Sequence, residues 1–121
     1  MKAFFISTLI FLAMVLLVFY NYIYINGTSD RLEELTVEIL FRSENLNEAT
    51  SNLEEFWNKH KNKLDLTVNH QIVNSIGIKV TNIRLFVDNA DYRQLERELL
   101  LLKEEIKELR RPERFALGNI F

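Results

Sequence analysis

Hydrophobic residues follow two different patterns along this chain. Residues 3–25 (AFFISTLIFLAMVLLVFYNYIYI) are almost continuously apolar and contain no charged side chain. From Asn26 onward, apolar residues recur at steps of three and four, the period of an α-helix with one buried face. The pattern predicts an all-α protein, with a transmembrane helix in residues 1–25 followed by a helical domain in residues 26–121.

The apolar segment is long enough to cross a bilayer. At about 1.5 Å per residue it extends roughly 34 Å, against a hydrocarbon core of about 30 Å. Three tyrosines (Tyr20, Tyr22 and Tyr24) lie at its end, where amphipathic rings favour the headgroup level. The alternative, a cleaved signal peptide, has a shorter apolar core of roughly 7–15 residues and a small-residue cleavage site that FYNYIYING lacks. We interpret the segment as an uncleaved signal-anchor, and the short N-terminal tail favours a cytoplasmic N-terminus and an extracytoplasmic domain.

Four amphipathic helices are predicted in the remainder, over residues 30–42, 46–64, 71–87 and 92–110. In the second helix, Phe56 and His60 lie on the apolar seam and Trp57 widens it. Tyr92 begins the seam of the fourth helix. The third helix is rich in β-branched residues, which lower the propensity to form a helix. Its apolar residues keep the helical spacing for four turns, and we give this spacing more weight than the propensity.

Polar or irregular segments separate these helices. Residues 26–29 contain Gly27 and several good N-cap residues, which predicts a break in the helix. Residues 64–70 lack a helical period and are expected to form a packed connection, and the apolar tail 113–121 is expected to fold back onto the domain. Short connections favour antiparallel neighbours, so we predict a four-helix bundle made of two helical hairpins, with a repeat-like stack as the alternative.

Composition and charge narrow the possible functions. The chain has no cysteine, which excludes disulfides, thiol catalysis and cysteine-ligated metal sites. Residues 26–121 are acidic overall and show no basic stripe with interleaved aromatics, so nucleic acid is not an expected partner. The one local basic cluster contains Lys59, Lys61 and Lys63. It has fewer than the about four to eight basic residues of a lipid-headgroup site and lies far along the chain from the span, so we interpret it as a solvated helix end.

Catalytic and metal-binding patterns are absent from the sequence. His60 and His70 are the only histidines, and neither has a metal-ligand partner at helical spacing. His60 on a seam is read as a half-buried structural histidine, with a pH switch as the alternative, and His70 as a residue that caps a helix or bonds to the backbone. With three glycines and no phosphate-binding or nucleophile motif, we expect neither an enzyme nor a cofactor.

Several short stretches together resemble a known family. They are the opening MKAFF, Ser29-x-x-Leu32, Trp57-Asn58-Lys59, the linker Leu66-Thr67-Val68-Asn69-His70, and the terminal Asn119-Ile120-Phe121. In this order and spacing the chain resembles domain-of-unknown-function family 4363. The resemblance implies a short membrane-anchored helical protein of Gram-positive, often spore-forming bacteria, and implies no activity.

Two functional hypotheses follow. The first is a non-enzymatic single-pass membrane protein whose bundle binds another envelope or membrane protein, through the tail (Asn119, Ile120 and Phe121) or a face near Trp57. The second is a small-molecule or lipid binder with a pocket between the two hairpins, lined by Phe56, Trp57, Phe86 and Tyr92. In both, the N-terminal helix contacts membrane lipid. The seam of residues 71–87 is also compatible with a homo-oligomer.

Overall fold

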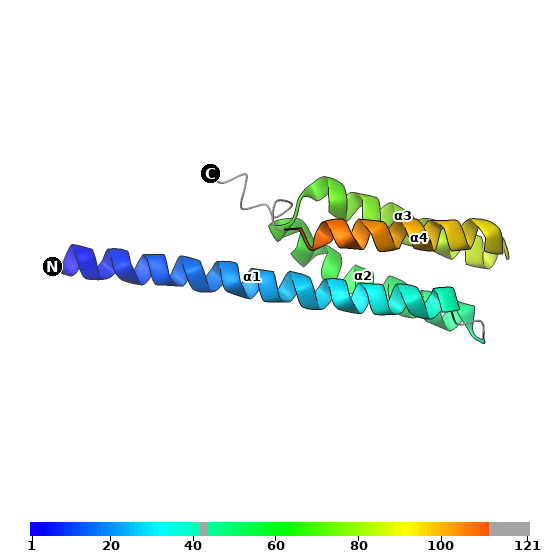
Figure 1. Ribbon diagram of the computed structural model, residues 1–121, viewed down its shortest axis with the longest axis horizontal. Helices are drawn as coiled ribbons and strands as arrows, with labels where there is room; N and C mark the ends of the chain where they lie inside the picture. Colours follow the sequence, from blue (N-terminus) through cyan, green and yellow to red (C-terminus); the bar gives the residue numbers. More distant parts are fainter. Residues whose placement is uncertain (42–43, 112–121) are drawn as a thin grey trace.

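Four α-helices account for nearly all of the part of the chain that the structure describes. The computed structural model describes residues 1–41 and 44–111. In chain order the helices are α1 (Lys2–Phe41), α2 (Leu46–Thr67), α3 (His70–Asp88) and α4 (Tyr92–Leu109) (Figure 1). The predicted all-α class is confirmed, and the predicted amphipathic helices correspond to the C-terminal part of α1 and to α2, α3 and α4.

Helix α1 is a single helix of 40 residues, so the predicted break at residues 26–29 is wrong. Ile25, Thr28 and Ser29 are buried, which places this stretch of α1 inside the bundle. Gly27 has no positive φ, and a methyl group added to it would meet nothing within 4 Å. Helical glycine costs only about 1 kcal/mol relative to alanine, and the tertiary contacts on both sides of Gly27 outweigh that cost.

The helices form a closed bundle rather than an open stack. Helix α1 packs against α2 and α4, and α3 also packs against α2 and α4, so each helix has two neighbours. Successive helices run in opposite directions, and α1 continues well beyond the other three at its N-terminal end (Figure 1). An open stack would leave α1 and α4 apart, so the contact between them decides for the bundle.

Side-chain caps define where three of the helices begin. The N–H of Glu48 donates to Oδ1 of Asn45 at 3.0 Å, and the N–H of Gln71 donates to Oδ1 of Asn69 at 2.8 Å. Asp91 caps α4 in the same manner. The connection predicted over residues 64–70 is shorter than expected, because α2 continues to Thr67 and leaves only two residues before α3.

The core follows the predicted seams with two corrections. Trp57, which was predicted to widen the seam of α2, is buried, whereas Phe56, which was predicted to lie on that seam, is only partly buried. Tyr92 is 60% exposed and does not join the seam of α4. The remaining predicted seam residues of α3 and α4 lie in or against the core, namely Val73, Ile76, Val80, Ile83, Val87, Leu95, Leu99, Leu102, Ile106 and Leu109.

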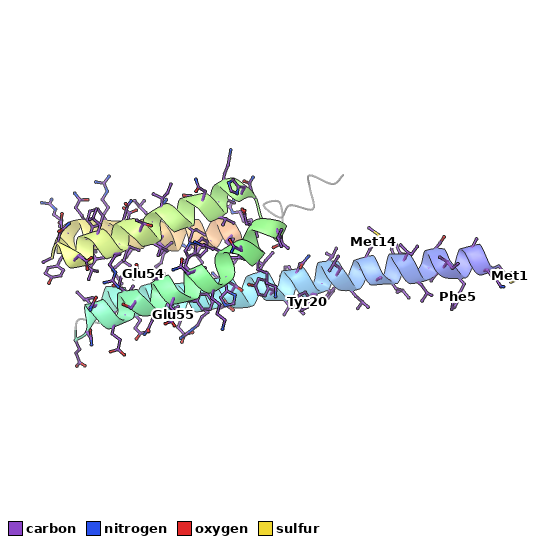
Figure 2. The ribbon with its side chains drawn as sticks, turned by 180° about the vertical axis from the view of Figure 1, so that it is seen from behind. Met1, Phe5, Met14, Tyr20, Glu54 and Glu55 are labelled. Atoms are coloured by element: carbon purple, nitrogen blue, oxygen red, sulfur yellow. The ribbon has the colours of Figure 1, made fainter. Side chains whose placement is uncertain are left out.

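The N-terminal part of α1 makes no contact with the core. An 18-residue window of α1 has a mean hydropathy of 2.6 and none of it is buried within the molecule. Its side chains, including Phe5 and Met14, project from an isolated helix (Figure 2). By length and composition this helix is able to cross a membrane.

Candidate functional site

Aromatic and basic side chains meet where α1 leaves the bundle. We call this region the tyrosine end, defined by Tyr20 and Tyr24 of α1 with His60 and Lys63 of α2; Figure 2 labels Tyr20 at this position. The hydroxyl of Tyr24 lies 2.7 Å from Nδ1 of His60. The ammonium group of Lys63 lies 3.4 Å from the hydroxyl of Tyr20 and 4.3 Å from the centre of the Tyr24 ring. Cation–π attraction and a hydrogen bond therefore hold this lysine against α1.

The surroundings of His60 favour the neutral form of its ring. Burial lowers its pKa below the usual value of 6.5, and the positive charges of Lys59 and Lys63 lower that pKa further. In the neutral ring with its proton on Nε2, the Tyr24 hydroxyl donates to Nδ1. The ring of Phe56 packs against the other side, with 4.3 Å between ring centres. These contacts place His60 in a partly buried aromatic cluster at the tyrosine end.

Lys63 lies beside the end of the apolar segment in space. Lys59, Lys61 and Lys63 are far from residues 3–25 along the chain, and this distance was one reason to interpret the cluster as a solvated helix end. The distance in space is shorter for Lys63, because α2 runs antiparallel to α1 and returns to its middle. The contact between Lys63 and Tyr20 joins residues 43 positions apart.

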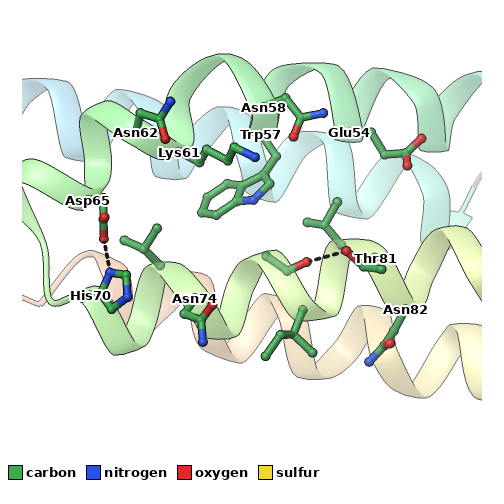
Figure 3. A pocket seen from close by; sticks show the side chains of 14 residues that line it. Glu54, Trp57, Asn58, Lys61, Asn62, Asp65, His70, Asn74, Thr81 and Asn82 are labelled. Carbon is green, nitrogen blue, oxygen red and sulfur yellow. Dashed lines mark hydrogen bonds and ion pairs between the residues drawn. The ribbon is translucent and has the colours of Figure 1, made fainter.

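An open groove runs between α2 and α3 (Figure 3). It has a volume of about 570 Å³, and Trp57 forms part of its lining. Nε1 of Trp57 lies 3.4 Å from the position that a Cβ would take at Gly77, so this glycine lets the indole approach α3 closely. At one end His70 and Asp65 are joined by a 2.6 Å contact. Four amide side chains add donors and acceptors along the walls, those of Asn58, Asn62, Asn74 and Asn82.

The residues predicted for a binding pocket do not line one cavity. Trp57 lines the groove, whereas Phe56 lines a separate hollow beside Arg31. Phe86 packs partly buried against the core, and Tyr92 is exposed at the first turn of α4. The tail residues Asn119, Ile120 and Phe121 lie outside the described residues.

Two features escaped the sequence reading. Arg84 of α3 bonds to Glu54 of α2, which lies 30 positions away in the sequence. These contacts raise the pKa of Arg84, chiefly through the hydrogen bond to Glu54.

The second feature is the outer face of α4, where Leu100 and Leu101 are 49% and 45% exposed. The run of four leucines from Leu99 to Leu102 was a usable signal, because four consecutive residues of a helix cannot all face one core.

Metal chemistry finds no support in the described part of the chain. No group of three or more histidine or acidic side chains there has the geometry to hold a metal ion. His60 is occupied by Tyr24 and His70 by Asp65, and the two rings lie on different faces of the molecule. The described part of the molecule has three other candidate surfaces. They are the aromatic and basic tyrosine end, the polar groove between α2 and α3, and the partly apolar outer face of α4.

Comparison with known proteins identifies the family. No curated protein and no solved structure matches the chain. A family model described as a domain of unknown function (DUF4363) matches residues 19–120. The match covers the C-terminal end of the apolar segment and all four helices of the bundle. This chain therefore belongs to the DUF4363 family.

Proposed function

We propose that this protein is a non-enzymatic, single-pass membrane protein whose helical bundle acts as an interaction module for another membrane or envelope protein. One observation carries the proposal: the same helix supplies both the unburied apolar segment and one wall of the bundle. An 18-residue stretch with a mean hydropathy of 2.6 and no buried residue is unfavourable in water and favourable in lipid.

The continuous helix also sets the height of the bundle above the lipid. Ile25 is the first core residue of α1 and follows Tyr22 by three positions, about 5 Å along a helix. A helix without a break transmits the orientation of the span directly to the bundle. The bundle is thus mounted against the membrane surface, and its partner is a protein that reaches the same surface.

We propose the orientation of a signal-anchor for α1. In this orientation Lys2, which precedes the uncharged segment, lies on the cytoplasmic side, where basic residues are enriched. The bundle then lies on the extracytoplasmic side of the cell membrane.

The outer face of α4 is the surface best suited to a protein partner. Leu100 and Leu101 lie in a hollow of about 440 Å³ and are flanked by Arg93, Arg97 and Lys103. None of these three basic side chains forms an ion pair with another described residue. Glu96 and Glu104 also line the hollow, but cations outnumber them. Exposed leucines with such a rim are complementary to an apolar surface that carries acidic side chains at its edge.

Co-purification from native membranes tests this proposal. We expect tagged full-length protein in mild detergent to capture a membrane protein that is lost when Leu100→Asp and Leu101→Asp are combined. Leu85→Asp is the matched control, since Leu85 is similarly exposed but lies outside the hollow. A second control keeps the apolar segment and replaces the bundle with an unrelated helical domain. Capture of the same protein by every version contradicts the proposal.

The groove between α2 and α3 supports a second candidate function, the binding of a small polar molecule. Its volume suits a small ligand, and its amide side chains offer paired donors and acceptors. Screening polar metabolites and envelope fragments against the full-length protein, followed by Asn62→Leu and Asn74→Leu, tests this function. Binding that survives both substitutions places the ligand elsewhere.

A further inference from the structure

We propose that Lys59, Lys61 and Lys63 form a site for the phosphate headgroups of anionic lipids, held against the same membrane that α1 crosses. This inference rests on the proposed function, because it requires the apolar part of α1 to lie in a bilayer. It assigns a ligand to a part of the bundle that the partner-binding proposal does not use.

The first support is the position of Lys63. Its ammonium group lies between the rings of Tyr20 and Tyr24, at the end of the uncharged segment. Tyrosines at the end of a span lie at the headgroup level, and long basic side chains near a span reach toward the same level. With α1 in a bilayer, the charge of Lys63 is therefore placed where the lipid phosphates are.

The second support is the height over which the three lysines are distributed. Lys59 and Lys63 are separated by about 6 Å along α2 at the helical rise. The headgroup layer of each leaflet is about 5 to 8 Å thick, from a total bilayer thickness of about 40–45 Å and a hydrocarbon core of about 30 Å. The backbone positions of the three lysines therefore span about the thickness of one headgroup layer.

The third support is that these charges are unneutralised. In the described part of the chain, none of the three lysines forms an ion pair. Other cations near this end are already paired: Arg110 with Asp30 and Glu33, and Lys107 with Glu104. Burial lowers the pKa of His60, and the positive charges of Lys59 and Lys63 lower that pKa further. An anion is the missing counterpart.

The fourth support is an apolar side chain beyond the lysines. Leu66 is 79% exposed in the last turn of α2. An exposed leucine next to a basic cluster is typical of helix ends that insert into the boundary between headgroups and acyl chains. Lysines followed by an exposed leucine suit a lipid surface better than a soluble anion.

The experiment measures amine acylation by a water-soluble reagent in lipid nanodiscs. Full-length protein is placed in discs of phosphatidylcholine alone or of phosphatidylcholine mixed with phosphatidylglycerol. We expect acylation of Lys59, Lys61 and Lys63 to slow several-fold in the anionic discs, since a lysine near an anionic surface gains about 1 kcal/mol, roughly fivefold in occupancy. Lys79 and Lys103, away from the tyrosine end, are internal controls whose acylation stays the same. Equal rates at the lysine cluster in both discs overturn the inference.

Dissolved phosphate distinguishes a lipid site from a general anion site. Inorganic phosphate is added to the phosphatidylcholine discs at the concentration of phosphatidylglycerol headgroups in the anionic discs. Little protection is expected, because the lysines gain from the surface potential as well as from each phosphate. Protection equal to that in the anionic discs overturns the assignment to lipid.

Variants separate the cluster from the overall charge. Combined Lys59→Gln, Lys61→Gln and Lys63→Gln is expected to lower the phosphatidylglycerol that co-purifies with the protein. The matched control removes the same charge from the outer face of α4, with Arg93→Gln, Arg97→Gln and Lys103→Gln, and retains wild-type lipid. Equal lipid retention by the two variants contradicts the inference.

Membrane insertion is measured separately by flotation. Protein that fails to insert overturns the proposed function as well, whereas inserted protein with unchanged labelling overturns the headgroup site alone.

Discussion

The side chain of Arg84 on α3 donates two hydrogen bonds to a single carboxylate oxygen of Glu54 on α2, at 2.9 Å from Nε and 2.7 Å from Nη2. The same guanidinium also reaches Asn47 and Ser51 of α2 and Asp88 of its own helix. Arg84 thus joins α3 to about two turns of α2, and no pattern in the sequence indicates this contact. With Arg84 22% exposed and Glu54 33% exposed, the pair is screened less than an ordinary surface ion pair.

Replacing Arg84 tests how much this link stabilises the bundle. We expect Arg84→Ala to lower the free energy of unfolding by about 1–2 kcal/mol, the range for a partly exposed charged hydrogen-bond group. Unfolding of the full-length protein in mild detergent is followed by the fluorescence of Trp57, which is the only tryptophan and is buried. Arg97→Ala, on the exposed face of α4, is the control and should stay within about 0.5 kcal/mol of wild type. Equal effects of the two substitutions would show that the link contributes nothing specific.

Gly27 provides a test of the continuous helix. Its backbone is helical and an added methyl group meets nothing within 4 Å, so Gly27→Ala should raise stability by about 0.5–1 kcal/mol. Gly27→Pro should instead cost about 3 kcal/mol or more, because proline removes a helical hydrogen bond. The same fluorescence assay measures both. A flexible hinge at residues 26–29 would reverse the expectation, with proline tolerated and alanine without benefit.

The stability of the tyrosine end should depend on pH. The pKa of His60 is lowered in the folded protein, so the folded state favours the neutral ring more than the unfolded state does. The resulting stabilisation is fully present above the unfolded pKa of about 6.5 and is lost as the pH falls through the lower folded value. Denaturation midpoints measured across this range should therefore fall on acidification. His60→Gln is expected to flatten this part of the profile, and an unchanged profile in that variant would assign the dependence to another group.

Thr50 contains a buried hydroxyl that has no hydrogen-bond partner in the described part of the chain. Thr50→Val preserves the shape and removes the unpaired group, so it should stabilise the bundle by about 1 kcal/mol. Thr36 is the matched control: it is equally buried, but its hydroxyl donates to the carbonyl of Leu32 at 2.7 Å. Thr36→Val should therefore not stabilise. Parallel urea titrations compare the two, and a loss of stability in Thr50→Val would reveal a partner for that hydroxyl.

Parts of the site were visible in the sequence and parts were not. His60 on a helix seam predicted a half-buried histidine, which its contacts with Tyr24 and Phe56 agree with. Which of two adjacent aromatics faces the core was not determined, because Phe56 and Trp57 differ by only 100° around α2 and both suit a core. The exposed leucines of α4 could have been predicted from the run of four consecutive leucines. The 3–4 spacing of the seam accounts only for the two leucines that are buried.

The class of the fold, the apolar segment and the extent of most helices could be predicted from local patterns, because helical periodicity and hydrophobicity are local properties of the chain. The continuation of α1 through Gly27 depends on packing, since burial of Ile25 and Ser29 against the other helices overrides the local preference for a break. Packing also places Lys63 beside Tyr20 and Arg84 beside Glu54. Those contacts depend on the antiparallel register of the helices, which packing of the whole core sets and no single segment encodes.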